Sequence, residues 1–391
     1  MTTSQIRVRG IAELIATLPM QLGYRPEDSL VLVLLDPPEQ APTAARPSGA
    51  IRVMCRFDLP HDAGGYEEAL RALTTVLRRQ ASGVAELVAF EDEEGTDATE
   101  VLRAVARLCA LEGVGVDRVA RVRGDQWLEV GPEDLPAVWR VLPSVDRVPA
   151  AADLVLAGAA VGPGRAELSR RIREGDAVRQ AEVLAEVQDY VARFERAVAP
   201  GGEAAGEPEE GGPPGGDPLA VLRAEAHCLR IHARFVERGA RAWRRILDAT
   251  PEGPSVADLP SAVLAQGLTV LWNREFRDGL IAWLAPGNLG PGLLPGEITD
   301  ALVRHLPISR VGGPAPVDRL VDLCALVPDE IAAPLLTVTA QVAWALNKGT
   351  LANLAIERAL QVEPDYYLAR LTDQLLQHVV RPPAGPFAAT A

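Results

Sequence analysis

Acidic side chains follow three apolar runs that have the length of buried β-strands. They are Asp36 after residues 30–35, Asp58 after 51–57, and Glu91 with Asp92 after 85–90. In an open parallel sheet, residues just past the carboxyl ends of the strands line the crevice where ligands bind. Carboxylates gathered there would hold Mg²⁺, as enzymes acting on phosphate groups require. The alternative is structural, because aspartate often ends a strand by capping the turn that follows.

A second set of polar residues precedes the first of these strands. Pro26, Asp28 and Ser29 form a conformational loop in our interpretation, in which the proline rigidifies the turn and the other two residues cap it. A catalytic serine would need a histidine base, and His61 is the only histidine in the N-terminal half. No Gly-x-Ser-x-Gly elbow surrounds any serine. We therefore name no catalytic residue.

Arginines recur at helical spacing after residue 218, beside an apolar seam that includes Val236, Trp243 and Leu247. The five arginines are Arg230, Arg234, Arg238, Arg241 and Arg245. Such a stripe is either a solvated helix face or a surface that binds an acidic protein or phosphates. We expect no nucleic-acid partner, because the chain carries a net charge of −14 and no aromatic residues alternate with the arginines.

Composition excludes several classes of protein. Lys348 is the only lysine among 39 basic residues, and it follows Asn347, so no phosphate-binding loop of the Gly-Lys-Ser/Thr type is present. No run of 18 apolar residues exists, and the N-terminal segment lacks the order of a signal peptide. The four cysteines lie too far apart in the sequence for a zinc knuckle. We expect a cytoplasmic protein with no membrane contact and no cofactor, or Mg²⁺ in the alternative interpretation.

The order of the segments predicts an α+β protein. Over residues 1–150, strands at 30–35, 51–57 and 85–90 alternate with helices at 11–18, 66–79 and 98–111, and residues 116–130 predict a strand, a Gly-Asp turn and a return strand. This order predicts a mostly parallel α/β sheet. Connecting helices follow at 151–199, with breaks near Gly162–Gly164 and Gly175. Residues 200–218 hold seven glycines, five prolines and five acids, and predict a flexible acidic linker. Residues 219–382 predict a helical domain and 383–391 a disordered tail.

The end of the helical domain carries the spacing of a tetratricopeptide unit. Ala352, Ala359 and Pro364 match the second half of such a unit, in which small residues allow two helices to pack closely. Only one unit is present, whereas a solenoid needs about three. We therefore expect a helical hairpin that completes a bundle, rather than a peptide-binding groove.

Several segments resemble one family of actinobacterial proteins. They are LGYRPEDSLVLVLL at 22–35, FDLP at 57–60, LVAFED at 87–92, REFRDGL at 274–280 and the block at 342–371. Over nearly the whole chain the sequence resembles the family grouped as domain of unknown function 4192. It departs from that pattern at Asn347 and Lys348, and it lacks a cysteine after Trp127. The resemblance implies no activity and no catalytic residues.

Two functional hypotheses follow. We favour a non-enzymatic interaction or regulatory protein that binds another protein through its helical half, because no complete catalytic constellation is present. The alternative is a metal-dependent enzyme that acts on a phosphorylated small molecule at the strand-end carboxylates. The distance between the carboxylates of Asp36, Asp58 and Asp92 separates the two hypotheses.

Overall fold

The computed structural model describes residues 10–36, 51–79, 83–92, 97–131, 138–156, 161–198, 218–250, 253–286, 295–306, 314–346 and 348–377. These residues form two compact units, the first extending to Arg165 and the second from Ala166 to Leu376. The predicted linker lies outside the described residues except for Pro218, and the predicted tail lies wholly outside them.

The first unit contains a six-stranded sheet in the order β2-β1-β3-β4-β5-β6. The strands are β1 (Ser29–Leu35), β2 (Ile51–Asp58), β3 (Val84–Glu91), β4 (Gly115–Arg123), β5 (Gln126–Glu129) and β6 (Arg140–Val141). Only β3 and β4 pair in parallel, and β1 runs antiparallel to both of its neighbours, β2 and β3. The α+β class is confirmed, but the sheet is mixed rather than mostly parallel. A reason can be found in the sequence. Residues 37–50, which join β1 to β2, contain four prolines, and proline disfavours the crossover helix that a parallel pair usually needs.

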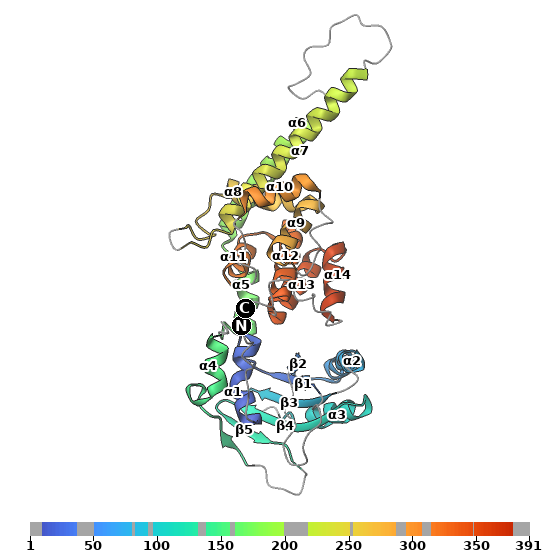
Figure 1. The fold of residues 1–391 in the computed structure, drawn as a ribbon, viewed down its shortest axis with the longest axis vertical. Coiled ribbons are helices and arrows are strands. Elements are labelled where there is room, and N and C mark those ends of the chain that lie inside the picture. The colour runs from blue at the N-terminus through green and yellow to red at the C-terminus, as the bar shows by residue number, and fades with distance from the viewer. Residues whose placement is uncertain are drawn as a thin grey trace, which may run out of the picture. The chain divides into compact units, whose positions relative to one another are not determined.

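Helices cover both faces of this sheet (Figure 1). Leu30, Leu32 and Leu34 of β1 pack with α2 (Ala63–Arg79) and α3 (Thr99–Leu111) on one face. Val31 and Val33 pack with α1 (Ile11–Leu22) on the other. Because successive side chains point to opposite faces, a strand that is buried on both sides must be apolar throughout. This requirement explains the continuous run at 30–35. A further helix, α4 (Pro149–Leu156), packs against α1.

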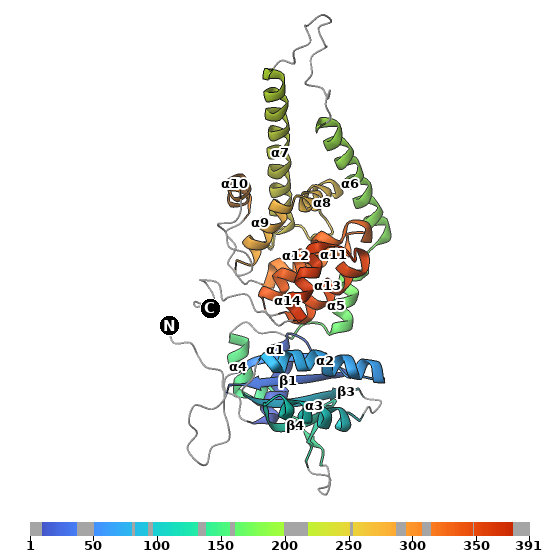
Figure 2. The ribbon, with the colours of Figure 1, turned by 90° about the vertical axis from the view of Figure 1, so that its right-hand side faces the viewer.

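The described residues of the second unit form helices and no strands (Figure 2). The longer helices are α5 (Arg165–Arg173), α6 (Ala177–Val198), α7 (Pro218–Ile246), α8 (Ser261–Thr269), α9 (Arg274–Leu284), α10 (Gly296–His305), α11 (Pro314–Ala325), α12 (Ala333–Ala345), α13 (Gly349–Val362) and α14 (Tyr367–Gln377). Short 3-10 turns occur at Val145–Arg147, Val270–Trp272 and Asp329–Ile331. The breaks predicted near 162–164 and 175 separate α4, α5 and α6. Asn273 separates α9 from α8, because it caps α9 by accepting a hydrogen bond from the backbone N–H of Phe276.

Helix α7 is anchored to α8 by its apolar seam. Val236 and Trp243 are buried, and the Trp243 indole N–H donates to the carbonyl oxygen of Gly267 at 2.9 Å. A side chain at Gly239 would come within 2.6 Å of Val270, so glycine permits this close approach. On α6, Tyr190 and Phe194 pack against Phe235 of α7. These contacts fix which side of α7 faces the core.

Near the end of the unit, α12 and α13 pack against one another. Ala352 and Ala359 are buried on α13, which ends two residues before Pro364. The likeness of this pair to a tetratricopeptide unit stays a prediction. No helix in the described ranges is long and apolar enough to cross a membrane.

Candidate functional site

One edge of the sheet gathers polar side chains from several strands. Ser29, at the start of β1, pairs with Asp58 at the end of β2 and with Phe90 near the end of β3. Asp58, Glu91 and Asp92 therefore lie at this edge. Asp36 follows the opposite end of β1, because that strand is antiparallel to its neighbours, and there it pairs with Arg52 at 2.7 Å. The four acids proposed as metal ligands do not come together.

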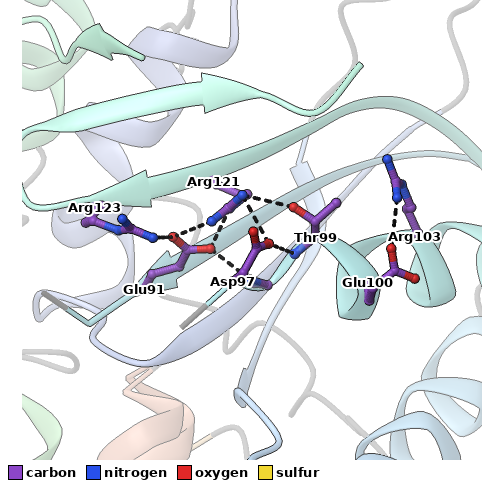
Figure 3. Close-up of polar contacts among 8 residues, drawn as sticks. Glu91, Asp97, Thr99, Glu100, Arg103, Arg121 and Arg123 are labelled. Carbon is purple, nitrogen blue, oxygen red and sulfur yellow. Dashed lines mark hydrogen bonds and ion pairs between the residues drawn. The ribbon is translucent and has the colours of Figure 1, made fainter. Parts of the chain in front are cut away.

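Glu91 is enclosed by positive charge (Figure 3). Its side chain has 0% exposure, and its two carboxylate oxygens accept from Arg121 Nε at 2.5 Å and Arg121 Nη2 at 3.1 Å. Arg123 Nη2 donates to the second oxygen at 3.0 Å, and the backbone N–H of Ala98 donates to the first at 2.9 Å. These bonds occupy the carboxylate, and two guanidinium groups beside it would repel a metal ion.

The same cluster fastens the first turn of α3 to the sheet (Figure 3). Arg121 Nη1 donates to the Thr99 hydroxyl at 2.9 Å and pairs with Asp97 at 3.1 Å. A hydrogen bond from Thr99 lowers the pKa of Asp97. Trp139 lies against both guanidinium groups, with its ring centre 5.6 Å from Arg121 and 5.2 Å from Arg123. With two arginines and two acids, the cluster carries no net charge.

The loop before β1 holds a second polar group at this edge. Asp28 has a φ of 43°, in the left-handed region that non-glycine residues seldom occupy. Its Oδ2 lies 2.5 Å from Nε2 of His61, and its carbonyl oxygen accepts from the backbone N–H of Leu59 at 3.0 Å. The hydrogen bond and charge of Asp28 raise the pKa of His61, and Asp92 adds to this effect. The histidine is therefore held near the acids of the edge.

Ser29 does not face that histidine. Its side chain is buried, and its hydroxyl accepts from Arg56 Nε at 2.8 Å and donates to the carbonyl oxygen of Glu27. Arg56 also pairs with Asp58. Pro26, the remaining member of the predicted loop, is buried. The structure thus groups Asp28 with His61, and Ser29 with Arg56, and assembles no nucleophile–base pair from these residues.

The arginine stripe lies on the exposed side of α7. Arg234, Arg238, Arg241 and Arg245 are exposed, while the seam on the other side of the helix is buried. For Arg230, the structure describes the backbone but not the side chain. Arg241 pairs with Glu237 at 4.0 Å, and Arg238 hydrogen-bonds to Tyr190.

Arg234 and Arg245 differ from the other described members of the stripe. Their side chains have no hydrogen bond or ion pair with the described residues. Nothing in the described part of the chain therefore neutralises these two charges.

The helical unit contains a cavity that was not predicted from the sequence. Its volume is about 320 Å³, and it is lined by the first turn of α9 and by the segment that joins α13 to α14. The lining includes Arg274, Arg277, Glu363 and Tyr366. One indication of this site was present in the sequence: these residues lie in two of the segments that carry the family resemblance, 274–280 and 342–371.

Within the described residues, no three His, Cys, Asp or Glu side chains lie close enough to share a metal ion. The described cysteines, Cys55, Cys109 and Cys324, form no disulfide with one another. Burial raises the pKa of both Cys109 and Cys324 to about 11, so neither carries a reactive thiolate.

Comparison with protein families identifies the family of this chain. A family model described as "Domain of unknown function (DUF4192)" matches residues 12–383, which is nearly the whole chain. Searches of the curated proteins and of the solved structures found no match. The cavity, the arginine face of α7 and the polar edge of the sheet all fall within that span. The chain therefore belongs to the DUF4192 family of proteins.

Proposed function

We propose that this protein is a non-enzymatic interaction protein whose helical unit binds an acidic segment of another protein through the arginines of α7. The observation that supports it is the division of α7 into two sides. Trp243 and its neighbours hold one side against the core, while Arg234, Arg238, Arg241 and Arg245 remain exposed on the other.

Charge favours an acidic partner. Residues 231–246 contain five arginines and one glutamate, within a chain whose net charge is −14. A cationic strip on an otherwise acidic protein attracts a short acidic segment and repels a large polyanion that would also meet the rest of the surface. Acidic side chains would pair with guanidinium groups in bidentate fashion.

A protein partner agrees better with α7 than a nucleic acid does. Binding to single strands relies on exposed aromatic side chains that stack with bases. Among the described side chains of α7, Trp243 is buried and Phe235 is packed against α6, so neither is free to stack.

The enzymatic alternative has weaker support. It required carboxylates that converge on a metal, yet Asp36 lies at the far edge of the sheet and Glu91 is occupied by Arg121 and Arg123. Asp58 and Asp92 share an edge, but Asp58 is already paired with Arg56. We therefore propose no cofactor.

A charge reversal tests the proposal. Labelled poly-L-glutamate serves as a defined acidic probe, and its binding to the full chain is followed by fluorescence anisotropy. We expect the wild-type protein to bind the probe, with an affinity that falls as salt is added. The Arg234→Glu/Arg245→Glu variant should lose at least about tenfold in affinity, because two attractions become repulsions.

Reversal of arginines elsewhere is the matched control. Arg71→Glu/Arg107→Glu makes the same change in net charge at exposed positions on α2 and α3. That variant should bind the probe as the wild-type protein does. Equal losses in both variants, absence of binding at low salt, or tighter binding of duplex DNA than of poly-L-glutamate would each contradict the proposal.

A further inference from the structure

The cavity in the helical unit has the dimensions of a small-molecule site. Its volume of about 320 Å³ is at the lower end of the range of roughly 300–1,000 Å³ that ligand pockets occupy. Arg274 and Arg277 of α9 line one side of it, and Tyr366, Tyr367 and the first turn of α14 line the other. A ligand of this size would contact both segments at once.

Arg277 supplies buried hydrogen-bond donors to the cavity. Only 8% of its surface is exposed, and its Nε and Nη2 donate to one oxygen of Asp278 at 2.9 and 2.7 Å. Its Nη1 donates to the Tyr366 hydroxyl at 2.8 Å. A guanidinium group has five N–H donors, so two remain without an acceptor among the described residues. Buried donors of this kind favour an acceptor supplied by a ligand.

Tyr366 adds a third donor beside them. Its oxygen accepts the bond from Arg277, which leaves its own hydrogen to donate. Burial raises the pKa of Tyr366, so the hydroxyl keeps that hydrogen at neutral pH. The floor of the cavity therefore presents donors that suit a carboxylate.

Arg274 places a full positive charge nearby. It lies one helical turn before Arg277, is exposed, and has no hydrogen bond or ion pair within the described part of the chain. An exposed arginine above a buried one lets a carboxylate approach with its charge compensated from two sides.

The remaining lining residues define the rest of the ligand. Glu363 and Asp365 are exposed and acidic, whereas Leu368 and Leu371 are apolar. Asp278 is paired with Arg277, and Asp365 lies 3.9 Å from Arg370. The acids around the cavity thus balance the arginines, which favours a singly charged carboxylate over a doubly charged phosphate group. A carboxylate joined to an ammonium group and an apolar side chain matches all three kinds of surface.

We infer that this cavity binds a free amino acid with an apolar side chain. Its carboxylate meets Arg274, Arg277 and the Tyr366 hydroxyl. Its ammonium group lies toward Glu363 and Asp365, and its side chain packs against Leu368 and Leu371. This site is independent of the arginine face of α7, so either proposal can fail without the other.

Calorimetry with L-leucine and the full-length chain tests the inference. We expect saturable binding to the wild-type protein, and binding at least about tenfold weaker in Arg274→Gln and in Tyr366→Phe, because each removes a donor to the carboxylate. Arg107→Gln, at an exposed position of α3, and Tyr190→Phe make the same chemical changes outside the cavity and should bind L-leucine as the wild-type protein does.

Two analogues separate the ligand's groups. L-Leucinamide lacks the carboxylate and N-acetyl-L-leucine lacks the ammonium group, so both should bind at least about tenfold more weakly than L-leucine. Absence of L-leucine binding to the wild-type protein overturns the inference. So does equal binding of either analogue, or a loss in the control variants as large as that in Arg274→Gln.

Discussion

Arg121 donates a hydrogen bond to each carboxylate oxygen of Glu91, whose side chain has no exposed surface. The two residues lie 30 positions apart, on strands that pair in parallel. Their contact joins the ends of β3 and β4 at the point where α3 begins. A buried charge of this kind is tolerated only because its partners surround it.

Removal of the Glu91 charge should therefore destabilise the first unit. Glu91→Gln leaves the buried Arg121 with only the exposed Asp97 as its counter-charge, which we expect to cost about 3–5 kcal/mol in the free energy of unfolding. Urea denaturation followed by tryptophan fluorescence measures this. Glu100→Gln is the matched control, because Glu100 is exposed and its pair with Arg103 should contribute only about 0–1 kcal/mol. Similar losses in both variants would show that the enclosure of Glu91 has no special role.

Divalent metal should leave the thermal stability of the protein nearly unchanged. Asp36 and Asp58 lie at opposite edges of the sheet, because β1 and β2 run antiparallel. Both carboxylate oxygens of Glu91 already accept hydrogen bonds from Arg121 and Arg123. A ligand at 100 times its dissociation constant would stabilise the fold by about 2.7 kcal/mol, which differential scanning fluorimetry detects. A rise in melting temperature with millimolar Mg²⁺ or Mn²⁺ that Asp58→Asn abolishes would instead support the metal-dependent enzyme.

Trp243 should be among the most sensitive positions of the helical unit. The side chain is wholly buried and its indole N–H bonds to Gly267. Trp243→Ala should leave a cavity and cost about 3–5 kcal/mol. Trp272→Ala removes the same side chain from a position with 50% exposure and should cost much less. Thermal unfolding followed by circular dichroism compares the two variants, and equal costs would contradict the assignment of the core side of α7.

The pair of His61 and Asp28 predicts a pH dependence with a definite sign. The pKa of His61 is raised above the ordinary value of 6.5, chiefly by the hydrogen bond and charge of Asp28, with Asp92 and Asp62 contributing. The protonated pair therefore stabilises the fold fully below pH 6.5, and this contribution is lost as pH rises through the raised pKa.

An NMR titration of the His61 ring measures this pKa directly. Asp28→Asn keeps the shape of the side chain and tolerates the left-handed backbone, so it should lower the pKa without distorting the loop. A wild-type pKa at or below 6.5, or a value that Asp28→Asn leaves unchanged, would show that the pair does not form in solution.

Local features of the sequence predicted most elements of the fold. The apolar run at 30–35, the Gly-Asp turn at 124–125 and the seam of α7 each act within a few residues, and each forms the predicted element. Strand direction was not predicted, because pairing depends on distant segments. The one local sign was the proline-rich sequence between residues 35 and 51, which disfavours a crossover helix and so favours an antiparallel pair.

The contacts that form the candidate sites depend even more on residues that are far apart in the sequence. Glu91 was correctly placed at the end of a strand, but its enclosure depends on Arg121 and Arg123, which nothing near residue 91 reveals. Arg277 and Tyr366 meet across 89 positions of sequence. Only the fold brings such pairs together, so their chemistry could not be inferred from spacing.

The two faces of β1 differ in the size of the side chains they bury. Leucines at 30, 32 and 34 face α2 and α3, whereas valines at 31 and 33 face α1. A slip of one residue in pairing would carry every side chain to the opposite face. Each leucine would then crowd a space shaped for valine, and each valine would leave a gap of one methylene group, which costs about 0.8 kcal/mol. Residues 30–35 have no polar side chain that would distinguish one face from the other, so their alignment with β2 and β3 is encoded by side-chain volume.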